Sequence, residues 1–366
     1  MVINNILKWL KVNLFSTWYN IIITVLTGLM LYYWVIHPFF DWGILHAVFN
    51  AHNKKECLAG GGHGACWGFV TTNLGRFIYG LYPIDQRWRV DLAFVMAIVL
   101  IGPMFSKHIP NPPGLWRKPK LWLGMINLSL LPLAVFILLR GDVFGLRSVE
   151  THLWGGFLLT VVLATTGIIC SLPISVLLAL GRRSDMPIVK ALSVVFIEFI
   201  RAVPLITLLF MATTMLPLFA PKGTTFNDLG ACIIAIILFS SAYMAEVIRA
   251  GLQGVAKGQY EAAKSLGLSY WKMQLLVILP QAFTITLPNI VSTIIGLFKD
   301  TSLVMIVGLF DLLGMIENTL SDPLWLGGFI YEGFIFAAAL YFVCCFALSR
   351  YSIRLEKNLQ KQDKII

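Results

Sequence analysis

Charged and hydroxyl side chains interrupt long apolar stretches at two places in this sequence. Glu198 and Arg201 lie three residues apart, on one face if the segment is helical, and Lys299–Leu303 follows another apolar stretch. A charge at membrane depth costs several kcal/mol unless it is paired or faces water. The first pair therefore predicts either an internal salt bridge that holds helices together or the lining of a polar path, and one role does not exclude the other.

The second place offers hydrogen-bond donors and acceptors of both signs, which suits a zwitterionic ligand such as an amino acid. The alternative is a turn that only caps a membrane span. Two polar residues on one face of the preceding stretch predict either path lining or a hydrogen bond across helices. The residues concerned are Lys299, Asp300, Thr301 and Ser302 in the turn, and Asn289 and Thr293 before it.

Groups for covalent catalysis are not gathered anywhere. The sequence contains no GxxxxGK(S/T) phosphate loop, no HExxH zinc pattern and no GxSxG nucleophile turn. The six histidines and the scattered acids form no catalytic cluster. We therefore expect no catalytic residue, no metal site and no bound cofactor, and any ATP must bind to a partner.

The composition is that of an integral membrane protein. Of 366 residues, 58% are hydrophobic and 13% are charged, whereas soluble domains carry about 25% charged residues. The net charge of +10 could indicate nucleic-acid binding. However, the cations cluster between apolar stretches, as in the cytoplasmic loops of membrane proteins.

Eight stretches are long and apolar enough to be membrane spans. They cover about 18–37, 89–106, 121–139, 154–180, 189–217, 228–248, 276–298 and 328–349. No small-residue cleavage site follows the first one, so we expect a retained anchor rather than a signal peptide. Lysine and arginine favour the side of the two termini by roughly two to one, which predicts cytoplasmic termini.

The longest polar segment, about 41–88, should then be periplasmic. Its Cys57 and Cys66 are nine residues apart and could form a disulfide in an oxidising compartment. They could also remain free thiols, or bind a metal with His52 and His63, although the spacing fits no standard zinc pattern. Cysteines in apolar stretches are expected to be inert packing residues, namely Cys170, Cys232, Cys344 and Cys345.

A hydrophilic segment, Glu261–Pro280, lies between the sixth and seventh spans. Glu261, Ala262, Ala263 and Lys264 favour a helix. Gly267 can end that helix in a left-handed conformation or admit another backbone. Pro280 predicts a break before the next span. By helix chemistry alone, this is an ordinary short cytoplasmic helix.

The full spacing resembles the EAA loop of inner-membrane permeases of ABC importers. In that family, Glu-Ala-Ala is followed by Gly after three residues and by Ile-x-Leu-Pro after nine more. The matching residues are Glu261, Ala262, Ala263, Gly267, Val277, Leu279 and Pro280, with Val277 in place of Ile. In the family, this loop is a short coupling helix that fits a groove of a cytoplasmic ATPase.

Three further segments resemble the polar amino-acid (histidine/glutamine-type) branch of these permeases. Phe196–Leu205 resembles its E-F-x-R-x-x-P-L stretch, Ala242–Tyr260 resembles AYxxExxRxGxxxxxxGQ, and Lys299–Leu303 matches K-D-T-S-L. The matching residues of the second segment are Ala242, Tyr243, Glu246, Arg249, Gly251, Gly258 and Gln259. Long N-terminal extensions make the general L-amino-acid permeases the nearest subgroup.

The resemblance implies an all-α polytopic protein with a type I ABC importer permease core. We expect residues 1–150 to be an extension with three spans, 151–350 the core with a coupling loop at about 249–275, and 351–366 a cytoplasmic tail. The implied function is ATP-driven amino-acid import. The alternative is a secondary transporter driven by an ion gradient, which leaves the Glu261 segment unexplained.

The resemblance also implies partners. These are two cytoplasmic ATPases that use ATP and Mg, a second permease that is identical or related, and a periplasmic amino-acid-binding protein. The residues expected to meet the ATPase are Glu261, Ala262, Ala263, Gly267, Gly258 and Gln259.

Overall fold

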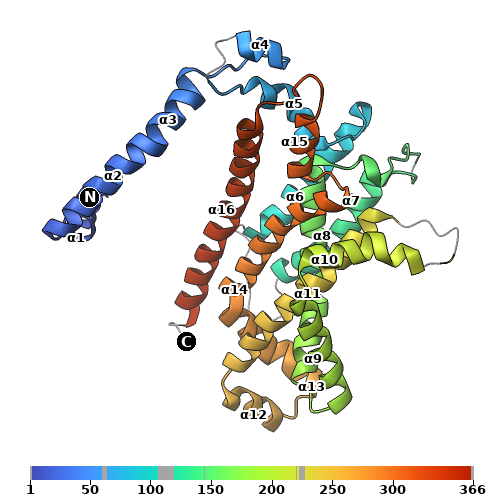
Figure 1. Cartoon of the computed structure of the whole chain (residues 1–366). Helices are drawn as coiled ribbons and strands as arrows, with labels where there is room; N and C mark the ends of the chain where they lie inside the picture. Colours follow the sequence, from blue (N-terminus) through green and yellow to red (C-terminus); the bar gives the residue numbers. More distant parts are fainter. Residues whose placement is uncertain are drawn as a thin grey trace. The chain divides into compact units, whose positions relative to one another are not determined.

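The computed structural model describes residues 2–59, 64–105, 119–143, 145–219, 221 and 227–363 (Figure 1). Throughout these ranges the regular structure is helical, with isolated β-bridges and no strand. The predicted all-α class is therefore confirmed.

The helices follow one another with short connections, several of which are single π- or 3₁₀-helical turns. In chain order they are α1 (Val2–Asn13), α2 (Trp18–Leu31), α3 (His37–Phe40), α4 (Lys54–Ala59), α5 (Gly68–Tyr79), α6 (Arg87–Phe105), α7 (Pro119–Arg140), α8 (Gly156–Arg182), α9 (Pro187–Ala202), α10 (Leu205–Phe210), α11 (Asp228–Gly254), α12 (Lys257–Ser265), α13 (Tyr270–Met273), α14 (Leu279–Asp300), α15 (Leu312–Leu320) and α16 (Ile330–Asp363).

The chain divides into two compact units. Unit 1 comprises Met1–Leu74 and Thr319–Phe336, and unit 2 comprises Gly75–Asn318 and Ala337–Ile366. This division differs from the expected one, since unit 1 holds only part of the extension and takes in the end of α15, the connection after it and the start of α16. Contacts within unit 1 explain why: Lys54 donates from its backbone amide to the carbonyl of Leu324. The boundary near residue 150, as the limit of a permease core, stays a prediction.

Unit 1 contains a long helical stretch, Trp18–Leu45, that runs from α2 through α3 with π-helical turns. Its apolar side chains are largely exposed, as lipid contact requires of a spanning helix. The apolar centre of the unit is Phe69, which is 0% exposed. Its ring packs 5.3 Å from that of Trp325 and 6.1 Å from that of Phe329, between ring centroids.

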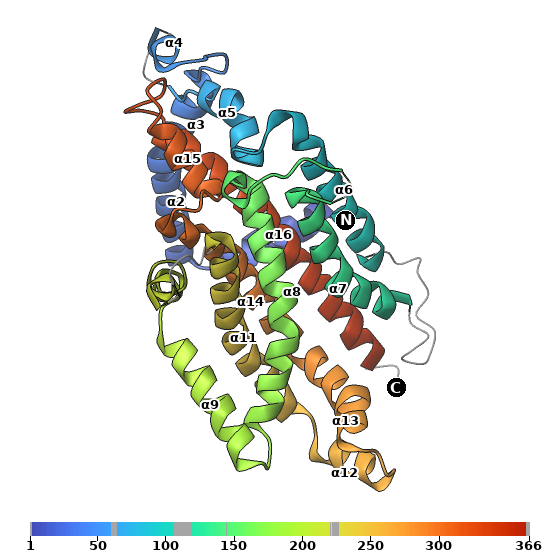
Figure 2. The same ribbon diagram turned by 90° about the vertical axis from the view of Figure 1, so that its right-hand side faces the viewer.

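Unit 2 is a helical bundle centred on α11, which packs against both α8 and α14 (Figure 2). Small residues allow the backbones to approach closely. A Cβ at Gly167 would lie 2.8 Å from a methyl of Ile236, and one at Gly251 would lie 2.6 Å from the carbonyl oxygen of Ala282. This is the small-residue packing that helices use in membranes, where burial supplies little driving force.

The described residues contain five helices long and apolar enough to cross a membrane, or six if a sharply bent pair counts as one span. The five are Trp18–Leu45, Gly156–Arg182, Asp228–Gly254, Tyr270–Val307 and Ile330–Glu356. The predicted spans at 89–106 and 121–139 coincide with α6 and α7, which continue into residues whose side chains lie outside the description. The count of eight stays a prediction.

The span predicted at 189–217 is sharply bent at Pro204, a residue whose missing amide donor favours a bent helix. The chain turns by 102° between Pro187–Ala202 and Leu205–Phe219. Val203 and Pro204 between them have extended backbone angles, because a proline disfavours helical geometry in the residue before it.

Candidate functional site

The segment that begins the expected coupling loop forms the short helix α12, at the lower end of Figure 1. Gly267 ends it in the left-handed conformation, with φ of +70°. The amide of Leu268 donates to the carbonyl of Ala263 (3.2 Å), and that of Gly267 donates to Lys264 (2.9 Å). These two bonds form a Schellman motif. The predicted left-handed helix end is confirmed, and none of the described residues beyond its chain neighbours lies within 4 Å of the position that a Gly267 Cβ would take.

Most of the surface of α12 is uncovered. Glu261, Ala262 and Lys264 are exposed, and the following Leu266 is 79% exposed, whereas Ala263 is only 2% exposed. Ala263 packs in an apolar cluster with residues of α8, α9, α11 and α14. Ala263 is thus the buried contact of the helix, and the exposed face that carries Glu261, Ala262 and Lys264 is available to a partner.

Gly258 and Gln259 occupy the first turn of α12. Gly258 is exposed and has open space where a Cβ would stand. The side-chain carbonyl of Gln259 accepts a bond of 3.1 Å from the side-chain amide of Gln281 on α14. Gln259 therefore ties the start of α12 to the next long helix.

The break expected at Pro280 is wrong. A π-helical turn, Gln274–Ile278, connects α13 directly to α14, and Pro280 lies in the first turn of α14. Tyr270–Val307 therefore continues as one candidate span. The π-helical turn directly before Pro280 accommodates the missing amide donor, as local π-helical adjustments do for prolines in membrane helices.

An ion-pair cluster joins α8, α9 and α11 near the end that carries α12. Glu198 accepts a bond of 2.7 Å from Arg182 of α8 rather than pairing directly with Arg201. Arg182 also lies 3.1 Å from Glu246 of α11. Glu246 in turn lies 2.8 Å from Arg249 and 3.9 Å from Arg201. The inter-helix salt bridge expected of Glu198 thus exists, with a different partner.

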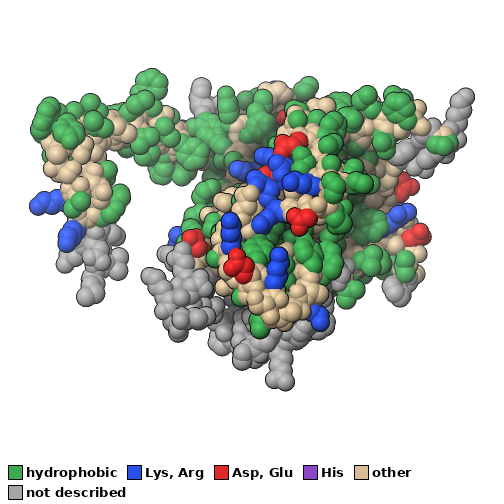
Figure 3. All heavy atoms as spheres, turned by 90° about the horizontal axis from the view of Figure 1, so that it is seen from below, with side chains coloured by type: hydrophobic (Ala, Val, Ile, Leu, Met, Phe, Trp, Pro, Cys, Tyr) green, Lys and Arg blue, Asp and Glu red, His purple; other side chains and the backbone are tan. Residues whose placement is uncertain are grey.

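Arg182 is the residue that the sequence interpretation missed. Its side chain is 22% exposed and connects two acids on different helices. In the sequence it appears only as one of two arginines after an apolar stretch, which predicts nothing beyond an interfacial charge. Figure 3 shows lysine and arginine side chains gathering on the underside, with a few acidic side chains among them.

The polar turn after α14 uses its hydroxyls locally. Thr301 is 0% exposed and donates to the carbonyl of Phe298 (2.8 Å), and Ser302 donates to that of Lys299 (2.9 Å). Lys299 is exposed and Asp300 half-buried. This geometry suits a capping turn, and ligand binding by these four residues stays a prediction.

Asn289 and Thr293 lie one turn apart on α14. The hydroxyl of Thr293 donates to the backbone carbonyl of Asn289 at 2.9 Å, and the Asn289 side chain is exposed. The hydroxyl is therefore used within its own helix, while the amide of Asn289 faces outward and keeps its predicted role as a path residue.

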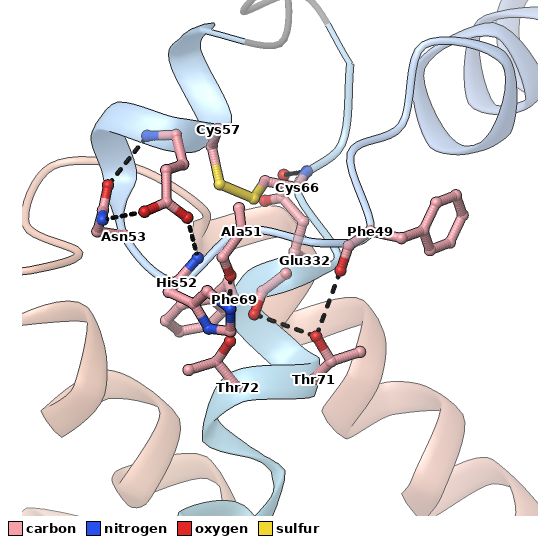
Figure 4. The surroundings of a disulfide bond; sticks show 12 residues. Phe49, Ala51, His52, Asn53, Cys57, Cys66, Phe69, Thr71, Thr72 and Glu332 are labelled. Atoms are coloured by element: carbon pink, nitrogen blue, oxygen red, sulfur yellow. Dashed lines mark hydrogen bonds between the residues drawn. A yellow bond between two sulfur atoms is a disulfide. The ribbon is translucent and has the colours of Figure 1, made fainter.

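Cys57 and Cys66 are joined by a disulfide, with their Cα atoms 5.9 Å apart (Figure 4). Because each sulfur is bonded to the other, neither thiol is available as a metal ligand. The amide of Cys66 donates to Oε1 of Glu332 at 2.8 Å, and that carboxylate is 4% exposed. His63 lies outside the described residues. Cys170, Cys232, Cys344 and Cys345 are unbridged and at least half-buried.

A second tie fastens the same loop. The ammonium of Lys54 donates to the carbonyl of Leu326 at 2.8 Å. The first tie connects Cys66 to the first turn of α16, and the second connects α4 to the segment between α15 and α16, all within unit 1. We call this assembly of the disulfide, Glu332, Lys54 and Phe69 the disulfide clamp.

A family model described as a binding-protein-dependent transport system inner membrane component matches residues 171–360. The inner membrane amino-acid ABC transporter permease protein YhdY of Escherichia coli (strain K12) is 49% identical over 351 residues, covering 96% of this chain and 92% of the relative. The glutamate/glutamine/aspartate/asparagine transport system permease protein BztC of Rhodobacter capsulatus is 39% identical over 414 residues, covering 98% and 94%.

A crystal structure of an amino acid ABC transporter with histidines aligns with a TM-score of 0.49 and 30% identity. It covers 56% of this chain and 92% of that chain.

Proposed function

This chain belongs to the family of binding-protein-dependent transport system inner membrane components and is the permease of an ABC importer, and we propose that its cargo is amino acids. Both curated relatives, which match nearly the whole chain, are named as permeases of amino-acid transport systems. The polar turn at Lys299–Ser302 agrees with this, since it offers both charges to a zwitterion. Membership of this family favours ATP-driven import over the alternative of a secondary transporter driven by an ion gradient.

We propose that α12 is the coupling helix. The geometry of α12 supports this role. The helix has nine residues, of which one is buried, and it is ended by Gly267, which has open space where a Cβ would stand. An ATPase groove can cover Glu261, Ala262 and Leu266 without disturbing the core of the permease. Gly267 leaves room for the ATPase at the end of α12, because a side chain at this position would occupy space in the groove.

The partners follow from this role. An ABC permease works with an ATPase, a binding protein and a second permease, and we propose two ATPase copies and a second permease that is identical or related. ATP and Mg bind to the ATPase, and this chain supplies no residue for their chemistry. Closure of the ATPases pulls α12 and shifts the path between inward- and outward-open states, a two-state rocking motion.

The protein is a multi-pass inner-membrane protein, and we propose that both termini and α12 face the cytoplasm. The excess of lysine and arginine on that side supports this orientation. The disulfide clamp then faces the periplasm, where a disulfide persists. Glu198 and Arg201, within the ion-pair cluster, are proposed to line or gate the inner end of the path.

Affinity purification of this chain from its native membrane in mild detergent tests the proposal. We expect a P-loop ATPase to accompany the wild-type chain and to be lost with Gly267→Asp, because the aspartate fills the open side of α12. Gly308→Asp is the matched control: it also has a positive φ (+87°) and open space, but lies outside the loop. Recovery of the chain without an ATPase, under conditions that preserve known complexes, contradicts the coupling role.

A further inference from the structure

We infer that Arg183 is a positioning residue that carries the movement of α12 to the ion-pair cluster through its neighbour Arg182. The inference rests on the proposed coupling role of α12. The two arginines are consecutive at the C-terminal end of α8, and each contacts a different part of the molecule.

Arg183 contacts the coupling helix itself. Its Nη1 donates to the hydroxyl of Tyr260 at 3.0 Å, and its guanidinium carbon lies 5.6 Å from the centre of the Tyr260 ring. Tyr260 directly precedes Glu261 within α12. Its hydroxyl donates in turn to the carbonyl of Leu252 on α11, at 3.0 Å. Tyr260 is thus the point where α12, α11 and the end of α8 meet.

Arg182 contacts the path side. Its Nη1 lies 2.7 Å from Glu198 of α9 and 3.1 Å from Glu246 of α11. Its side chain is mostly buried, and so is that of Glu246, which is 15% exposed. The side chain of Glu198 is 53% exposed, so its pair with Arg182 is screened more than the buried pair between Arg182 and Glu246. A shift of the end of α8 therefore acts most strongly on α11 through Glu246, and it reaches Glu198 of α9 through the same guanidinium.

The link between the two arginines is stiff. The amide of Arg183 donates to the carbonyl of Leu180 at 3.1 Å, which closes the last turn of α8. A Cβ at Gly181 would lie only 2.3 Å from Oγ of Ser193, so the end of α8 packs directly on α9. Displacement of α12 is consequently passed to the α8–α9 pair rather than absorbed by a loose connection.

The bend that follows α9 can take up a displacement of this helix. α9 ends at the extended residues Val203 and Pro204, beyond which the chain turns by 102°. These two residues separate the ends of two helices, and such element ends are the positions at which hinges absorb a change of backbone angles. The route therefore runs from α12 through Tyr260, Arg183 and Arg182 to α9 and its bend.

The test uses the complete transporter, reconstituted in vesicles with its ATPase and binding protein. The readout is the number of ATP molecules hydrolysed per amino acid imported, with ATPase co-purification measured alongside. For Arg183→Ala we expect the ATPase to co-purify as before. The number of ATP molecules hydrolysed per amino acid imported should rise about 2- to 5-fold, which is the change expected for the loss of one exposed cation–π contact. Tyr260→Phe, which keeps the ring, should give a smaller rise, and Arg183→Lys should restore part of the coupling.

Arg350→Ala is the matched control, because Arg350 stacks on Phe346 at 5.8 Å in α16, away from α12. The double variant Arg183→Ala/Tyr260→Ala should give no higher ratio than Tyr260→Ala alone, as expected for two residues on one route. If Arg183→Ala does not reach the membrane, Tyr260→Phe and Arg183→Lys decide the question.

Three outcomes overturn the inference: an unchanged ratio in Arg183→Ala, an additive double variant, or loss of the ATPase from Arg183→Ala. The last outcome would make Arg183 a docking residue. These outcomes differ from failure of the proposed function, in which the wild-type chain itself brings no ATPase and Gly267→Asp changes nothing.

Discussion

The disulfide clamp and the coupling helix hold their backbones in opposite ways. The clamp combines a covalent bond, a buried carboxylate, a lysine bonded to a distant carbonyl and a fully buried phenylalanine. In α12, one alanine is buried, one tyrosine and one glutamine reach neighbouring helices, and a glycine ends the helix. The first arrangement fixes a loop against motion, whereas the second lets a short helix move as one body while keeping its register.

Loss of the aromatic centre of the disulfide clamp should have the largest effect on stability. Phe69→Ala leaves a cavity beside Trp325 and Phe329, and we expect it to destabilise unit 1 by about 3–5 kcal/mol. Limited proteolysis of residues 319–329 measures this. The matched control is Leu58→Ala, because Leu58 is 53% exposed in the same unit. Equal protease resistance of the two variants would show that Phe69 does not hold the clamp.

Removing the disulfide should have the next largest effect. Cys57→Ala combined with Cys66→Ala releases a loop of sequence separation nine. We expect a loss of about 2–3 kcal/mol, since the bond restricts a short loop of the unfolded chain. Hydrogen exchange of the Cys66 amide, which is bonded to Glu332, reports it. Cys344→Ala serves as the control, and a clamp equally protected in both variants contradicts the prediction.

Two neighbouring alanines of α12 test the difference between its buried face and its exposed face. Ala263→Leu places extra volume in the packed cluster and should cost about 1–3 kcal/mol. Ala262→Leu lies on the exposed face and should change stability by less than about 0.5 kcal/mol. We nevertheless expect Ala262→Leu to weaken co-purification of the ATPase. Thermal unfolding measured together with co-purification separates the two effects, and identical behaviour of the pair would be evidence against a one-sided helix.

The two glycines at the start and the end of α12 should give small effects on stability, of opposite sign. Gly267→Ala forces a side chain into the left-handed region and should destabilise the end of α12 by about 1 kcal/mol. Gly258→Ala, in the first turn with open space around it, should stabilise the helix by up to about 1 kcal/mol. Hydrogen exchange of the α12 amides measures both, and a shift of equal sign would contradict this account of the helix end.

Helix α12 and its end could be predicted from sequence because their determinants are local. Helix-forming residues followed by Gly267 specify a short helix and its end within a few residues. Hydropathy likewise predicted the apolar helices, including that around α11. Such signals need no knowledge of which helices become neighbours.

The ion-pair cluster could be predicted only in part. Glu198 required a partner, but three cations lie within reach of α9 or α11, and helix spacing favoured Arg201. The structure pairs Glu198 with Arg182 because α8 packs directly on α9 at Gly181. The position of the bend after α9 could be predicted from Pro204, but its size could not, since a proline in an apolar stretch can kink a span or divide it, and hydropathy does not distinguish these.

The bond from Cys66 to Glu332 has a consequence for biosynthesis, since the two residues are 266 positions apart. At translation rates of about 5–20 residues per second, the ribosome reaches Glu332 about 13–53 s after Cys66. The cysteines are close enough in sequence to be oxidised long before that. We therefore expect the N-terminal segment to be cross-linked before the C-terminal part of unit 1 is synthesised. The amide of Cys66 and the ring of Phe69 obtain their partners in residues 325–332 only after that.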